Sequence, residues 1–163
     1  MTISEYLEAD HRRIEQLLLQ ATAANDRINP ELWQQFRGPL LRHIGMEEKI
    51  LFPAIRRAGA GESFQGLGQL HLDHGALAAL LVPTPTASII AAIRAILDGH
   101  NRIEEGPEGT YRRFEQMRDI DAGGILATLQ AAPAVVMNPH VDNATSIASM
   151  RAAVQRAGYA FDL

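Results

Sequence analysis

Apolar residues recur every three or four positions through the first hundred residues, which is the period of an α-helix with one buried face. In the first stretch this face carries Leu7, Ile14 and Leu18, and Thr2 or Ser4 stands where a helix cap is expected. Taken with the Pro and Gly residues that interrupt the period, this pattern predicts four helices, over residues 2–25, 30–57, 63–81 and 86–105.

Proline and glycine mark the breaks between these helices. Pro30 suits the first turn of the second helix, whereas Gly38-Pro39 and Pro53 lie inside it and are expected to kink or end it. Residues 59–61 form the next break, with Ser63 as a candidate cap, and two prolines separate the last two helices. Short connections between four helices predict an all-α, up-down-up-down four-helix bundle.

The helical pattern weakens past residue 107. Residues 110–118 can form a helical turn or two, 134–137 are typical of a short extended run, and 143–156 are typical of a helix. We therefore expect residues 1–118 to form the bundle. Residues 119–163 are expected to form a C-terminal extension that packs on the bundle or at a subunit contact, so a homo-oligomer is one of the expectations.

Composition narrows the class of protein. A chain of 163 residues predicts one domain. The net charge of −4 and the single lysine, Lys49, argue against a nucleic-acid partner. The absence of cysteine excludes disulfides and thiolate metal sites. No apolar stretch approaches membrane length and the first residues are acidic, so we expect no membrane partner and a cytoplasmic location.

One chemical pattern occurs twice along the chain. Each copy reads Asp-His, a long gap, and then His-x-x-x-Glu-Glu: first Asp10, His11, His43, Glu47 and Glu48, then Asp73, His74, His100, Glu104 and Glu105. A histidine and a glutamate four residues apart lie on one face of a helix. Four imidazoles and two carboxylates form a ligand set for two transition-metal ions; the six residues are His11, His43, Glu47, His74, His100 and Glu104.

Helix geometry predicts that these six residues meet. At 1.5 Å per residue, His11 and His43 both lie about 20 Å from the connection between the first and second helices. Glu47 and His74 both lie roughly 16 Å from the connection between the second and third helices. The step to His100 requires the proline loop to span roughly 9 Å, which a few extended residues can do. Glu47 shares its helix face with apolar residues, and a buried carboxylate is costly unless it gains a proton or a cation.

Neighbouring polar residues have two or more interpretations. His71 can be an additional ligand, a hydrogen-bond partner of a ligand, or a surface residue. The carboxylates next to the six can lie on a solvated face or accept a hydrogen bond from a ligand imidazole; they are Asp10, Glu48, Asp73 and Glu105. Tyr111 can approach the site if the chain stays helical through Pro107, and His140 is expected in a loop.

At these motifs the chain resembles the hemerythrin-like family, also called the HHE cation-binding domain, over roughly residues 1–118. The resemblance implies a four-helix bundle with a non-haem diiron centre bridged by an oxo or hydroxo group. It also implies terminal histidine ligands and bridging carboxylates: His11, His43, His74 and His100 would be terminal, and Glu47 and Glu104 would be bridges. A nitrogen-rich ligand set suits iron, with manganese or zinc as alternatives.

The chain departs from the oxygen-carrying members of that family in two places. Those members have His-x-x-x-His on the third helix and a His-x-x-x-x-Asp bridge on the fourth, whereas this chain has His71-x-x-His74 and Glu104 at the fourth position after His100. Counting about six positions per metal, binding by His71 would leave one position open and favour dioxygen capture. Otherwise each metal keeps one open position, which favours redox chemistry or nitric oxide handling.

Three functions are compatible with this interpretation of the metal site. The first is a diiron protein that binds or senses a small diatomic ligand, dioxygen or nitric oxide. The second is a diiron redox enzyme or an iron-handling or stress-response protein, acting in peroxide or nitric oxide reduction, iron storage or repair. The third is a regulatory metal domain whose output passes through the C-terminal extension. The pattern assigns no catalytic residue, so whether the chain is an enzyme stays open.

Overall fold

The computed structural model describes residues 1–23, 27–59, 64 and 66–163, and every regular element within them is helical. This confirms the all-α prediction. The elements are α1 (Ile3–Ala21), α2 (Pro30–Met46), the π-helix η1 (Glu47–Leu51), α3 (Phe52–Arg57), α4 (Leu67–Leu80), α5 (Ala87–Glu104), α6 (Thr110–Glu115), α7 (Ala122–Gln130) and α8 (Ala144–Arg156). None of these described helices has the length and apolar character that crossing a membrane requires.

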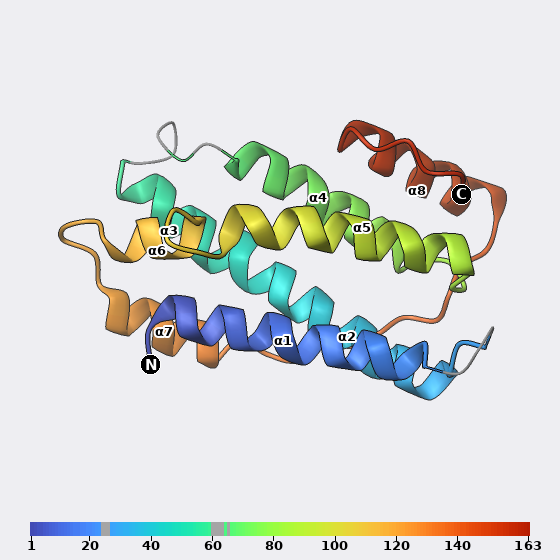
Figure 1. Ribbon diagram of the computed structural model, residues 1–163, viewed down its shortest axis with the longest axis horizontal. Coiled ribbons are helices and arrows are strands. Elements are labelled where there is room, and N and C mark those ends of the chain that lie inside the picture. The colour runs from blue at the N-terminus through green and yellow to red at the C-terminus, as the bar shows by residue number, and fades with distance from the viewer. Residues whose placement is uncertain (24–26, 60–63, 65) are drawn as a thin grey trace.

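Four longer helices, α1, α2, α4 and α5, run along the long axis of the molecule (Figure 1), and α1 packs against α2 while α4 packs against α5. The buried apolar residues of these helices and of the shorter elements form two separate clusters. One contains Trp33 and Phe36, and the other contains Phe52 and Phe114. The polar residues of the doubled motif occupy the layer between these two clusters, so each apolar cluster closes one end of that layer.

The helix starts follow from local capping. Thr2, rather than Ser4, caps α1: the Thr2 hydroxyl accepts a hydrogen bond from the Glu5 backbone N–H, and the Glu5 carboxylate accepts one from the Thr2 N–H. The Ser4 hydroxyl instead donates to Glu115 on α6 (2.7 Å). The helix ends at Ala21, earlier than predicted, and residue 25 lies outside the described residues.

The predicted second helix is helical over its whole length but changes from an α-helix to a π-helix and back, just before Pro53. The chain remains α-helical through Pro39, where the lost backbone hydrogen bond is offset by the burial of Trp33, Phe36 and Leu40. Of the two predicted effects of these prolines, a kink or an end, the end is absent, because α2, η1 and α3 follow one another without a gap. Near Pro53 the helix widens into η1, where the Phe52 N–H donates to the carbonyl of Glu47, five residues back.

Pro53 explains this π-helical segment in part, because it has no N–H to donate to the carbonyl of Lys49. The widened turn begins at Glu47, one of the six candidate ligands. Gly59, with φ of +75°, follows the end of α3 as predicted for a break. The remaining residues of that break, 60 and 61, and the candidate cap Ser63 lie outside the described residues.

The C-terminal part of the chain packs along the bundle. The helix α6 contacts α1 and α5, α7 contacts α1 and η1, and α8 contacts α4 (Figure 1). The helix predicted over 143–156 is present as α8, with Asn143 as its cap. Residues 134–137 form no strand, and residues 126–129, for which no helix was predicted, lie within α7.

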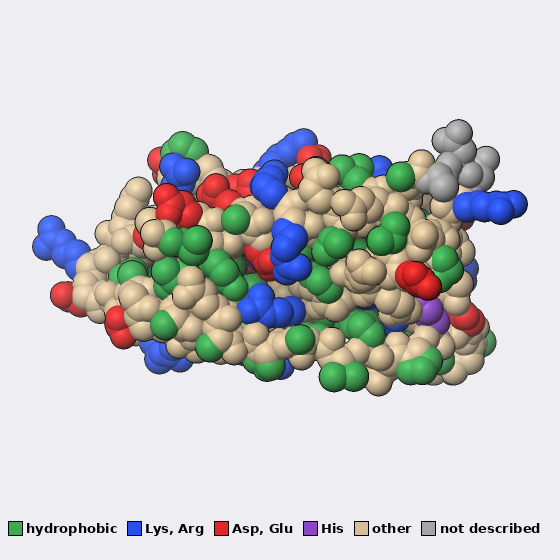
Figure 2. All heavy atoms as spheres, turned by 90° about the horizontal axis from the view of Figure 1, so that it is seen from below, with side chains coloured by type: hydrophobic (Ala, Val, Ile, Leu, Met, Phe, Trp, Pro, Cys, Tyr) green, Lys and Arg blue, Asp and Glu red, His purple; other side chains and the backbone are tan. Residues whose placement is uncertain are grey.

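On the face shown in Figure 2, basic side chains are interspersed with acidic and apolar ones and form no continuous stripe among the side chains drawn in colour.

Candidate metal centre

Four helices each contribute one histidine to a buried layer. The rings of His11 and His43 have centroids 4.3 Å apart, and those of His74 and His100 are 4.7 Å apart. The Nε2 atoms of His74 and His100 approach to 3.2 Å. The four histidines therefore lie at one level of the bundle, as the regular rise of an α-helix predicts, and this includes the step across the proline loop to His100.

Two fully buried carboxylates join the histidines into one cluster. Glu47 Oε2 lies 3.1 Å from His74 Nε2, and Glu104 Oε1 lies 3.2 Å from His100 Nε2. The ligand atoms fall into two overlapping sets in which all atoms lie within 4.8 Å of one another; one set is His11, His43, Glu47 and Glu104, and the other is Glu47, His74, His100 and Glu104. Because both carboxylates belong to both sets, each can be a ligand in either set.

Within each copy of the motif, the aspartate holds the histidine of the neighbouring helix. Asp10 Oδ2 lies 3.0 Å from His43 Nδ1, and Asp73 Oδ2 lies 3.4 Å from His100 Nδ1. Both aspartates are buried. The structure thus places both aspartates against histidines of the cluster and away from a solvated face.

Between the two copies, the second glutamate of each pair makes the equivalent contact. Glu48 Oε1 lies 2.7 Å from His74 Nδ1, and Glu105 Oε1 lies 2.7 Å from His11 Nδ1. Every histidine of the cluster thus has a carboxylate at Nδ1. A carboxylate accepts hydrogen bonds, so Nδ1 carries a proton, and Nε2 presents a lone pair to the centre of the cluster when the imidazole is neutral, the form that binds a metal.

The inner oxygens of the two glutamates lack partners. Glu47 Oε2 and Glu104 Oε1 are buried, and among the described residues neither has a hydrogen-bond donor in suitable geometry. Four imidazole lone pairs and two carboxylate oxygens therefore face one another in a region shielded from water. Cations or additional protons are required to make this arrangement favourable, and the donor set of imidazole nitrogen and carboxylate oxygen fits a transition metal.

The pKa shifts of these groups also favour positive charge in the cluster. Burial opposes the charged form of His43 and His100, but attraction to Glu47 and Glu104 outweighs burial and raises the pKa of each histidine to about 10. Burial also opposes ionisation of Glu47, yet attraction to His43 holds the pKa of Glu47 well below its ordinary value. The cluster therefore favours bound protons, which a metal ion would have to displace.

Tyr111 reaches the cluster from α6. Its hydroxyl lies 2.5 Å from Glu47 Oε1 and 2.9 Å from Glu104 Oε2, and the two carboxylates share its single proton. The same oxygen is 3.2 Å from His11 Nε2. Burial, followed by the charges of Glu104 and Glu47, raises the pKa of Tyr111 well above its ordinary value, so the hydroxyl stays protonated.

The route by which Tyr111 arrives differs from the predicted one. Tyr111 was expected to reach the site through a helix that continues past Pro107, but α5 ends at Glu104 and the chain turns at Gly106, with φ of +89°. The new helix α6 begins at Thr110. Tyr111 is thus directed back onto the cluster by a turn.

The two remaining histidines lie outside the cluster. The His71 side chain is 64% exposed, and its Nδ1 lies 3.0 Å from Glu48, which in turn holds His74. His71 is thus an exposed residue that contacts the outer carboxylate of Glu48 and none of the six candidate ligands. His140 lies in an irregular segment, as predicted for a loop residue, near Gln34.

The C-terminal extension also reaches this network. Asp73 Oδ1 accepts a hydrogen bond from Gln69 Nε2 (2.7 Å) and another from the hydroxyl of Tyr159 (3.0 Å). Gln69 donates as well to the backbone carbonyl of Ala157 (2.9 Å). Sequence reasoning missed Tyr159, because it is 86 residues from Asp73 and belongs to no motif.

A bundle of helices around buried histidines and glutamates that can hold cations is the architecture of a helical metal-binding protein. A family model described as the Hemerythrin HHE cation binding domain matches residues 2–107, and the chain belongs to this family. Searches of curated proteins and of solved structures returned no match. Tyr111 and Tyr159 both lie beyond the matched residues.

Proposed function

We propose that the chain binds two iron ions in this cluster and through them binds or senses dioxygen or nitric oxide. In this proposal the four histidines are terminal ligands, and Glu47 and Glu104 are bridges. The observation that carries the proposal is the pair of buried carboxylate oxygens without donors, faced by four Nε2 lone pairs. When bound, an iron pair supplies open coordination positions and electrons for a small ligand.

The chain's own residues prepare the cluster for this role. The outer carboxylates on Nδ1 fix the tautomer and orientation of each imidazole, which reduces the conformational freedom that metal binding would otherwise have to remove. Tyr111 holds the outer oxygens of both glutamates, leaving the inner oxygens for the cations. Since α6 supplies Tyr111, we propose that the functional unit extends over residues 1–118.

Iron is proposed over manganese and zinc because of the ligand type. Imidazole suits iron, copper, nickel and zinc, whereas manganese prefers oxygen ligands. Structural zinc sites are usually four-coordinate and mononuclear, while two ligand sets that share both carboxylates fit a pair of ions.

Metal analysis tests the proposal. Protein purified without added metal is expected to contain about two iron ions per chain, and the double substitution Glu47→Ala, Glu104→Ala is expected to remove them while a helical circular dichroism spectrum remains. Glu31→Ala, at an exposed carboxylate in the first turn of α2, is the matched control. Full iron content in the double variant would refute the bridging assignment.

A diiron redox enzyme or iron-handling protein is the second candidate, and the exposure of His71 favours it. With four histidines and two bridges, the coordination count leaves one position open at each metal. Aerating the ferrous protein separates the candidates. A spectrum that reverses under vacuum supports reversible binding, whereas irreversible oxidation, with consumption of added peroxide or nitric oxide, supports the enzyme.

A further inference from the structure

A cavity of about 650 Å³ opens onto the cluster. All four histidines line it, but Glu47, Glu104 and Tyr111 do not. A water molecule occupies about 30 Å³ of liquid, so this volume corresponds to roughly twenty waters. A dioxygen or nitric oxide molecule needs only a small fraction of it, whereas pockets for organic ligands typically measure about 300–1,000 Å³.

The walls of the cavity are mainly apolar. They are formed by side chains from all four long helices, namely Ile14, Leu18, Leu40, Ile44, Leu77 and Leu97. Leu18, Leu40 and Leu77 are almost fully buried within the larger apolar cluster. An apolar chain placed here would exchange water for hydrocarbon contacts along its whole length.

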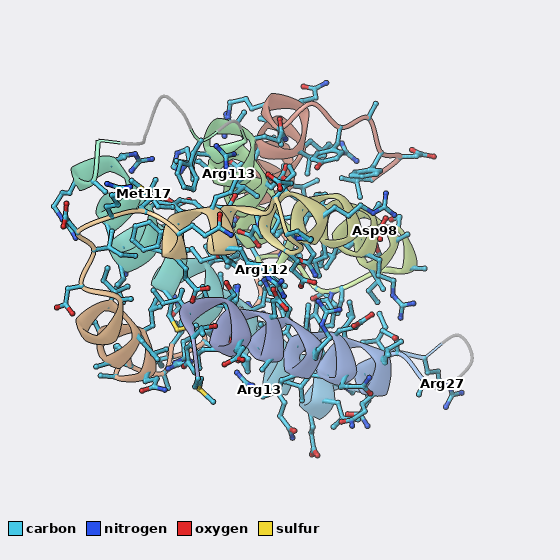
Figure 3. The ribbon with its side chains drawn as sticks, turned by 60° about the vertical axis from the view of Figure 1, so that its left-hand side comes forward. Arg13, Arg27, Asp98, Arg112, Arg113 and Met117 are labelled. Carbon is cyan, nitrogen blue, oxygen red and sulfur yellow. The ribbon has the colours of Figure 1, made fainter. Side chains whose placement is uncertain are left out.

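The mouth of the cavity is charged and lies between α1 and α5, since its exposed lining residues come from these two helices. Most of the charges are already paired: Arg12 contacts Glu105, and Arg102 pairs with Asp98 on α5 (Figure 3) at 2.6 Å. Arg94 differs, because no described carboxylate lies within 4.0 Å of it. Its guanidinium donates to the hydroxyl of Thr22 across the mouth (2.6 Å).

We propose that this cavity binds an organic monocarboxylate with an unbranched apolar chain. The carboxylate pairs with Arg94, and the chain extends along the apolar walls toward the histidines. Arg94 and His100 are six residues apart on α5, a separation of about 9 Å along the helix, which suits a chain of medium length. A single cation without an acidic partner favours one negative charge on the ligand.

This inference extends the proposed function, because it places an organic molecule beside the proposed metal pair, but binding itself does not require the metal. Isothermal titration calorimetry of the metal-free chain with saturated carboxylates from butyrate to dodecanoate tests it. Octanoate is expected to bind at least tenfold more tightly than butyrate and than n-octanol, which has the same chain without the charge.

Two substitutions locate the ligand. Arg94→Gln is expected to weaken octanoate binding about tenfold and to leave n-octanol binding unchanged, while Arg56→Gln, at an exposed arginine on α3, changes neither. Leu97→Trp, which adds volume to a half-buried position in the lining, is expected to abolish binding of both ligands. Thermal unfolding of each variant verifies that the fold is retained.

The inference is overturned if no carboxylate of the series binds, or if octanoate binding is insensitive to Arg94→Gln or to Leu97→Trp. Repeating the titration on the iron-loaded chain separates the two proposals. Octanoate binding without stoichiometric iron would refute only the diiron proposal, and stoichiometric iron without octanoate binding would refute only this one.

Discussion

Replacing Tyr159 by Phe tests whether the C-terminal extension supports the metal cluster. The substitution removes the hydroxyl that donates to Asp73 Oδ1 (3.0 Å), while Gln69 remains as a second donor. A hydrogen bond to a charged group contributes about 1.5–3 kcal/mol, and the lower end applies because Tyr159 is only partly buried. For a chain of this size, about 1.5 kcal/mol lowers the melting temperature by roughly 3–6 °C.

The metal affinity distinguishes a positioning role from a general loss of stability. Asp73 Oδ2 holds His100, so loosening Asp73 should weaken the ligand set that contains His74 and His100. Loss of a residue that contacts a ligand directly typically costs about 10–100-fold in metal affinity. Tyr159 is one contact further from the ligand, so we expect metal affinity to fall by less than about tenfold, and in only one of two binding steps. Competition titrations with a chelator measure both steps.

Tyr6→Phe is the matched control, because the Tyr6 hydroxyl contacts Arg42 and Met46 and no residue of the cluster. It should leave both metal-binding steps unchanged. Equal effects of Tyr159→Phe and Tyr6→Phe on metal binding, or an equal loss in both steps for Tyr159→Phe, would refute the argument that Tyr159 acts through Asp73 on one ligand set.

Three further predictions concern the cluster itself. The metal-free protein should lose thermal stability between pH 6.5 and about 10: the pKa of His43 and of His100 is raised to about 10 from an ordinary 6.5, so protonation stabilises the fold fully below 6.5 and is lost as the pH rises. A melting temperature constant over this range would contradict it. Asp10→Asn should lower metal affinity about 10–100-fold, because the carboxylate that holds Nδ1 of His43 is lost. Glu8→Gln, on the same helix but next to Arg112, serves as its control in the same chelator titration. Tyr111→Phe leaves two buried carboxylate oxygens without their donor and should cost the metal-free protein roughly 2–3 kcal/mol in urea unfolding; a loss within 0.5 kcal/mol of zero, as for an ordinary surface substitution, would show that the hydroxyl does not stabilise these groups.

The convergence of the six cluster residues was predictable because it depends on regular helix geometry. A rise of 1.5 Å per residue is enough to place His11 level with His43. The fixed spacing of four residues puts Glu47 one turn further along the same helix face as His43. The contacts of the outer carboxylates remained one of two alternatives, because residues about 100° apart on a helix can face either solvent or a neighbour. Only the packing of the helices decides between these alternatives.

Features that depend on irregular backbone were beyond sequence reasoning. The π-helical turn at Glu47 involves the missing N–H of Pro53, but an identical deficiency at Pro39 leaves an ordinary α-helix. The difference lies in tertiary packing, which no local pattern encodes. Likewise, the turn at Gly106 that brings Tyr111 to the cluster depends on a positive φ, and a glycine permits this conformation without requiring it.

The repeated motif suggests two equivalent halves, but the residues beyond it make the halves different. Tyr111 lies within 3.5 Å of Nε2 of both His11 and His43, so its hydroxyl faces one ligand set. Tyr159 acts on the other set through Asp73. Both tyrosines come from the part of the chain beyond residue 107, where the family match ends. The repeat therefore accounts for the ligands, whereas the later part of the chain gives each half a different environment, and two identical sets of donor atoms become chemically distinct positions.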